Sequence, residues 1–231
     1  MKTVRQRLDD ANPSHSYGLV LCMVLLVVFL TIALPDSTLG RFVLVVVDAA
    51  TLLVAVWTAH ARTRVREIAV IAVVVSVLGA AVALIVPGDT SAILRAITLV
   101  LVAGLPMILA RGVAGTVREN GVTLNAVSGV LTLYLMLALV FGVIYALCND
   151  LGDAAFFAQH SKDVAPGDFV YFAITTQTTV GFGDFVPGTS VGRAFASSQA
   201  VIGQMYLVTV VAVVMSHLGR GPRRAAPADD A

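Results

Sequence analysis

Long apolar runs separated by short polar stretches dominate the chain. Each run approaches or exceeds the length of helix that crosses about 30 Å of hydrocarbon at about 1.5 Å per residue. The first begins late and no small-residue cleavage site comes before Pro35, so we expect a span there and not a signal peptide. The pattern predicts an all-α membrane protein with six transmembrane helices. The runs are Tyr17–Leu34, Phe42–Ala59, Ile68–Val86, Ala92–Ala110, Val122–Cys148 and Val191–His217.

A shorter apolar, threonine-rich segment, Asp168–Thr178, lies between the last two runs. As a helix it would extend only roughly 16 Å, which is too short to cross the bilayer. Pro166 and Gly167 precede it like a helix start, with Asp168 placed to cap the exposed N–H groups. Non-helical backbone at membrane depth is tolerated only where protein or a water-filled cavity surrounds it. We therefore predict a re-entrant pore helix and a loop before the last span.

Composition and charge agree with this organisation. The 231 residues are 58% hydrophobic and only 13% charged, with a mean hydropathy of +0.91, which excludes an ordinary soluble domain. With both termini in the cytoplasm, only Arg41, Lys162 and Arg193 among the loop cations fall outside. The re-entrant segment then faces outward. A net charge of +1 with dispersed arginines gives no reason to expect nucleic acid as a partner.

The five residues Thr179-Val180-Gly181-Phe182-Gly183 directly follow the re-entrant segment. Gly181 and Gly183 reach positive φ without a Cβ clash, so the backbone can alternate in conformation and aim successive carbonyls at one axis. Carbonyl rings of this kind replace the water around a dehydrated potassium ion. The hydroxyl of Thr179 can add a further ring of hard oxygen ligands. One copy cannot enclose an ion, so several copies about an axis are needed.

Residues 175–184 (TTQTTVGFGD), followed by Pro187, resemble the pore region of the tetrameric potassium channel superfamily. The resemblance covers roughly Val122–His217, and the whole chain is similar to small bacterial six-span potassium channels without a voltage-sensor arginine series or a cytoplasmic regulatory domain. It implies a homotetramer in the bacterial inner membrane, with K⁺ held by Thr179, Val180, Gly181 and Phe182 and no organic cofactor.

The resulting domain organisation has five parts. Residues 1–16 form a cytoplasmic N-terminus, 17–110 a domain of four helices, 111–121 an interfacial linker, 122–217 the pore domain and 218–231 a cytoplasmic tail. Besides the lipid bilayer itself, anionic lipids are candidate partners of Arg111 and Arg118 in or beside the linker.

Two departures from the common family pattern concern the support of this filter. Phe182 stands where tyrosine is usual, so a hydroxyl behind the filter is missing. Tyr171 and Phe172 stand where two tryptophans are common, which leaves Asp184 without an indole partner. We expect the Tyr171 hydroxyl or a water to serve Asp184, and we count Tyr171, Thr178 and Asp184 as filter support.

Voltage dependence is expected to be shallow. Arg95 alone carries charge within the fourth run, and one charge crossing the field supplies only about 2.3 kcal/mol per 100 mV. Asp48 lies at a similar depth in the second run, so the two side chains could form an intramembrane ion pair. The alternative is that Arg95 is a remnant gating charge.

The final span offers candidates for a gate. Gly203 lies in its middle and could serve either bending or close helix packing. Leu207, Val211 and Met215 follow at helical spacing, and they could face the pore, lipid or a neighbouring helix.

Four further residues have candidate roles outside the filter and the gate. His60 and His217 could sense pH near the cytoplasmic interface, although simple solvation is the more common role there. Cys22 and Cys148 are expected to be small buried hydrophobes, with a disulfide or redox role as the less favoured alternative.

These observations predict a potassium-selective channel that conducts passively and is not an enzyme. A non-selective monovalent cation channel is the nearest alternative. A non-conducting sensor or transporter subunit is the alternative from another class, although the chain shows no repeated half of the transporter kind.

Overall fold

The computed structural model describes residues 17–34, 37–58, 67, 70–71, 73–75, 77–78, 106, 109–115, 123–159 and 162–218. Within these ranges the secondary structure is helical, apart from an isolated antiparallel bridge between Phe157 and Pro187. This agrees with the all-α prediction. The named helices are α2 (Tyr17–Ala33), α3 (Thr38–Thr58), α6 (Leu124–Leu151), α7 (Pro166–Gln177) and α8 (Ser190–Leu218).

Four of the apolar runs form the predicted helices, namely α2, α3, α6 and α8. The other two runs lie mostly outside the described residues, so six spans remain a prediction. Among the helices that the structure describes, the segment Asn125–Leu151 of α6 is long and apolar enough to cross a membrane by length and composition. Tyr17–Ala33 and Val43–Thr58 are apolar but shorter.

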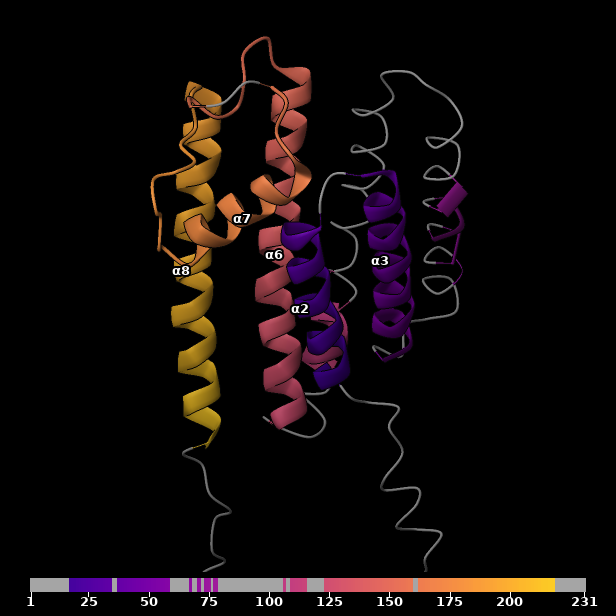
Figure 1. Cartoon of the computed structure of the whole chain (residues 1–231). Coiled ribbons are helices and arrows are strands. Elements are labelled where there is room, and N and C mark those ends of the chain that lie inside the picture. Colours follow the sequence, from indigo (N-terminus) through magenta and orange to yellow (C-terminus); the bar gives the residue numbers. More distant parts are fainter. Residues whose placement is uncertain are drawn as a thin grey trace, which may run out of the picture.

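Helices α6 and α8 are long and run side by side, and the short helix α7 lies between them partway along their length (Figure 1). Helix α7 begins at Pro166, with Ala165 as its N-cap. Asp168 therefore lies in the first turn, so its predicted role as the capping residue is wrong. The reason is that proline, with its fixed φ and missing N–H, favours the first helical position. The Asp168 carboxylate still lies near the positive end of the helix dipole.

The loop after α6 folds back over α7 and over residues 179–183, which are called the filter loop here after their predicted role. Asn149 holds it by donating from Nδ2 to Lys162 O (3.0 Å) and by accepting at Oδ1 from Phe156 N (3.0 Å). Ala158 N donates to Val186 O at 2.8 Å, which ties this loop to the segment after the filter. An aromatic cluster fills the space beneath it: Tyr145, Phe156, Phe157, Phe169, Phe172 and Phe185.

Helix α2 packs against the pore region of its own chain. Tyr17, Val20 and Val24 are buried in a cluster with residues of α3 and α6. At the other end of α2, the backbone at Thr31 approaches Gly167 of α7 so closely that a Cβ at Gly167 would overlap it. Helix α2 therefore forms part of the wall around the N-terminal end of α7.

Candidate functional site

The loop that follows α7 has the alternating backbone that its sequence predicts. Gly181 has φ +49° and Gly183 has φ +83°. Thr179 also has a positive φ, +60°, and within the described residues it is the only non-glycine residue that does. Val180 and Phe182, between these three, have negative φ. The left-handed conformation thus recurs at every second residue, which is costly for a β-branched residue such as Thr179 and marks a functional constraint.

Backbone hydrogen bonds attach the start of this loop to the last turn of α7. Val180 N and Gly181 N both donate to Thr175 O, at 2.9 and 3.2 Å. Thr179 N donates to Thr176 O at 3.1 Å. The N–H groups of Thr179, Val180 and Gly181 therefore point back toward α7. The carbonyl oxygens of the loop are left for other partners, as ion coordination by the backbone requires.

The side chains of the loop are exposed within a single chain. Val180 is 53% exposed and Phe182 is 70% exposed. The Phe182 ring lies parallel to the Tyr171 ring of α7, with ring centroids 6.3 Å apart. Stacking between rings thus substitutes for the missing hydroxyl as the contact of residue 182 with the pore helix.

The Tyr171 hydroxyl donates to Asp184 Oδ2 at 2.8 Å, so of the two partners predicted for Asp184, this hydroxyl or a water, the hydroxyl is the one in contact. Asp184 Oδ1 also accepts from Phe185 N at 3.1 Å. The bond to the carboxylate raises the pKa of Tyr171 above its ordinary value, because the protonated hydroxyl is the form that donates. Thr178 is exposed and donates to Ile174 O in the preceding turn, at 2.8 Å. That these residues support the filter stays a prediction.

Gly203 of α8 lies against the end of α7. A Cβ at this position would stand 2.7 Å from Gln177 Cγ and 3.0 Å from Gln177 O. This contact favours close packing over bending as the reason for glycine. Gln204, the next residue, approaches the Thr179 hydroxyl with Nε2 at 3.4 Å.

The predicted gate residues are placed only in part. Gly203 lies against Gln177 of α7. Gln204, beside it on α8, lies next to the Thr179 hydroxyl at the base of the filter. Leu207 is half-buried. The side chains of Val211 and Met215 lie outside the described residues. Both positions follow Gln204 at helical spacing, and a gate there stays a prediction.

The remaining predicted residues are described only in part, so the ion pair of Asp48 with Arg95 stays a prediction. Asp48 is exposed on α3, whereas Arg95 and His60 and the side chain of His217 lie outside the described residues. Cys22 and Cys148 carry free thiols. Cys22 is exposed on α2, so its predicted burial is wrong, because the apolar side of α2 that packs on α6 carries Val20 and Val24 instead.

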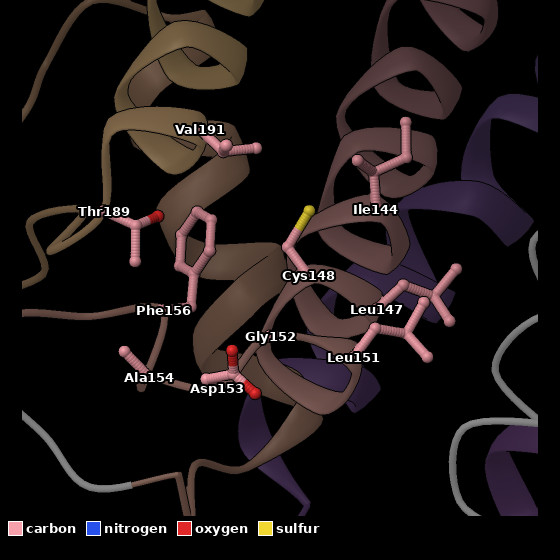
Figure 2. A pocket seen from close by; sticks show the side chains of 10 residues that line it. All are labelled: Ile144, Leu147, Cys148, Leu151, Gly152, Asp153, Ala154, Phe156, Thr189 and Val191. Atoms are coloured by element: carbon pink, nitrogen blue, oxygen red, sulfur yellow. The ribbon is translucent and has the colours of Figure 1, made fainter.

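A pocket of about 370 Å³ lies away from the filter loop, between the outer end of α6 and the start of α8. Figure 2 shows that its lining comes from α6, from the loop after α6 and from the first residues of α8. The lining is mainly apolar, with Cys148 on one side and Asp153 at the loop. Since it contains none of the residues 179–183, this pocket is not part of an ion path through the filter.

Several polar residues for which the sequence predicts no role are buried behind the filter. Gln177 and Gln199 are 1% and 0% exposed, on α7 and α8 respectively. Tyr145 of α6 is fully buried beside them and bonds to Gln199. The available signal was a hydrogen-bonding side chain within an apolar span, which is costly and therefore a functional candidate.

Comparison with known families identifies the part of the chain that carries this site. Residues 133–220 match the family model described as "Ion channel", which covers most of α6, all of α7, the filter loop and α8. Over these residues the chain is similar to the ion channel family, which supports an ion channel function for this part of the chain. No curated protein matches the chain.

Proposed function

We propose that this chain is a potassium-selective channel subunit that conducts K⁺ passively across the membrane. The observation that carries the proposal is the alternation of φ at Thr179, Gly181 and Gly183, in a loop whose first three N–H groups bond back to α7. Such a backbone leaves neutral carbonyl oxygens as ligands, and these suit a monovalent alkali cation. Thr179, Val180, Gly181 and Phe182 supply the carbonyls in this proposal.

A homotetramer is part of the same proposal. One loop cannot surround an ion, and the apolar side chains of Val180 and Phe182 stay exposed in the single chain. Val208 of α8, which follows Gln204 by one helical turn, is 68% exposed. Closed rotational symmetry places identical loops around one axis and covers these surfaces with neighbouring copies. In this arrangement both termini lie in the cytoplasm, and the filter faces outward.

The proposed channel is not steeply gated by voltage, because the fourth apolar run carries Arg95 as its only charge. Gating then falls to the filter, to the bilayer or to a separate partner. A current that rises steeply with voltage in planar bilayers would contradict this part of the proposal.

Flux measurements on the purified chain in liposomes test the function. We expect K⁺ flux that barium blocks, and reversal potentials in mixed K⁺ and Na⁺ that lie near the K⁺ equilibrium potential. Replacing Gly181 by alanine should abolish the flux, because φ is +49° there and a Cβ strains the backbone. The control is Gly115→Ala, at a helical residue with no atom within 4 Å of the new Cβ.

The outcomes separate the alternatives. Reversal potentials near zero in mixed ions would identify a non-selective cation channel. A folded, membrane-inserted chain without flux or barium sensitivity would identify a non-conducting subunit.

A further inference from the structure

Two buried glutamines meet where the pore helix ends. Gln177 is the last residue of α7 and stands two residues before Thr179, the base of the filter. Gln199 lies on α8, one helical turn before Gly203. Both side chains are inaccessible within the chain. Burying two carboxamides in an apolar region is costly unless every polar atom finds a partner, so their bonds decide what they do.

The carboxamide of Gln199 bonds to two other helices. Its Nε2 donates to Ala173 O (2.9 Å) and to Gln177 Oε1 (3.2 Å), both on α7. Its Oε1 accepts from the Tyr145 hydroxyl of α6 at 2.5 Å. One side chain of α8 is thereby joined to both neighbours.

The carboxamide of Gln177 completes the same set of bonds on the other side. Its Nε2 donates to Tyr134 O of α6 at 2.6 Å, and its Oε1 accepts from Gln199. The Tyr134 hydroxyl donates to the backbone oxygen of Gln177 at 3.1 Å. This oxygen is among the last carbonyls of α7, which have no partner within the helix. The end of α7 is therefore held from α6 and from α8 by directional bonds.

Shape alone does not require these bonds. An apolar side chain of similar volume could fill the space of Gln199, but it would leave the Tyr145 hydroxyl and Gln177 Oε1 buried without this partner. A fully satisfied set of hydrogen bonds instead specifies one arrangement, because each partner has to stand at the correct distance and angle. Here the bonds fix the position of the last turn of α7 along and around the helix axis. That turn carries Thr175, whose carbonyl accepts from Val180 N and Gly181 N.

We propose that Gln199 is a positioning residue for ion selectivity, which holds the filter through Gln177 and Ala173 by its carboxamide and not by its volume. The proposal rests on the proposed channel function. Without the carboxamide, the last turn of α7 can shift, the Thr175 carbonyl moves with it, and the filter oxygens lose the spacing that distinguishes K⁺ from Na⁺. Tyr145 contributes through Gln199 and does not itself reach the filter.

The test measures the K⁺ to Na⁺ permeability ratio from reversal potentials of the full chain in bilayers. This ratio does not depend on how many channels fold. In Gln199→Met, methionine keeps the length and volume but lacks the donor pair. We expect the ratio to fall by at least about fivefold, as expected when buried polar groups lose their partners. In Tyr145→Phe, which keeps the ring, we expect a fall of about twofold or more.

Ser198→Ala is the matched control, because Ser198 is exposed and its hydroxyl bonds only within α8, to Ala194 O. Its ratio should equal that of the wild-type chain. The double variant Gln199→Met, Tyr145→Phe should be no less selective than Gln199→Met alone, since the two residues act through one set of bonds.

Unchanged ratios in Gln199→Met and Tyr145→Phe, with a selective wild-type channel, would overturn this inference and leave the proposed function intact. If Gln199→Met fails to assemble, Tyr145→Phe decides alone, and an unchanged ratio there overturns the inference. A wild-type chain without selective flux overturns both.

Discussion

The two ends of the pore helix α7 are held by different kinds of contact. At the inner end, next to the filter base, Gln177 is buried and joined to α6 and α8 by hydrogen bonds. At the outer end, Phe169 packs into an aromatic cluster that continues to Phe172 in the middle of the helix, and Gly167 lies against α2. Apolar packing tolerates changes of shape that keep volume, whereas a hydrogen bond requires one atom at one place.

This difference teaches where accuracy is needed. A small error at the outer end of α7 is spread over many weak contacts in the cluster. The same error at the inner end displaces the Thr175 carbonyl, to which two N–H groups of the filter loop donate. We therefore expect substitutions at the inner end to change selectivity, and substitutions at the outer end to change mainly stability.

The largest combined effect, on both stability and selectivity, is expected for Gly203→Ala at the inner end. The new Cβ would press on Gln177 Cγ and on its backbone oxygen, at 2.7 and 3.0 Å. Overpacking of this kind costs about 2 kcal/mol, more than the roughly 1 kcal/mol that alanine gains over glycine in a helix. The melting temperature of the assembled channel and the permeability ratio should both fall.

Gly115→Ala is the control for this variant, because its Cβ would meet no atom within 4 Å. If Gly203→Ala behaves like Gly115→Ala in both measurements, the inner end of α7 is not tightly held. The comparison between the two ends would then lose its basis.

Sequence reasoning reached the features that depend on neighbours along the chain. The positive φ at Gly181 and Gly183 and the bond between Tyr171 and Asp184 fall within a short stretch whose geometry is local. The prediction of Asp168 as the cap of α7 is wrong, because Pro166 is already the first helical residue.

The pairing of Gln177 with Gln199 depends instead on how α8 is rotated about its axis. Apolar residues surround nearly all sides of α8, so hydropathy does not determine which side faces α7. For the same reason the sequence does not predict the contact of Gly203 with Gln177, although it marks Gly203 as a candidate for close packing. These residues come together through the relative placement of α6, α7 and α8, which the sequence does not determine.

An intermediate effect is expected for Phe172→Leu in the aromatic cluster. Phe172 is buried against Tyr145, Phe156 and Phe157. Leucine keeps the site apolar but smaller, so the loss should be about 1 kcal/mol, against about 3 kcal/mol or more for Phe172→Ala. Thermal unfolding should record this order, and the permeability ratio should stay at the wild-type value. A loss of selectivity in Phe172→Leu would show that apolar packing also positions the filter.

The smallest effect is expected for Tyr171→Phe, which removes the donor to Asp184 on an exposed surface. Without this bond the filter is less firmly supported, so we predict that the K⁺ current through open channels decays about twofold faster. The change is small because an exposed hydrogen bond contributes little. The pKa of Tyr171 is raised by this bond, so the bond is present at neutral pH and is lost as pH rises through the raised value.

Current decay of the wild-type channel should therefore accelerate at strongly alkaline pH, and Tyr171→Phe should lack this alkaline step. Equal decay rates in the two proteins at every pH would contradict a supporting role for Tyr171.

Helix α2 contacts α6 and α7 of the same polypeptide, and its Thr31 backbone adjoins Gly167. The bonds of Gln177 and Gln199 also join residues of one polypeptide. In the proposed homotetramer, these contacts would let each subunit seat α7 by itself, so that folding of the subunit precedes its association.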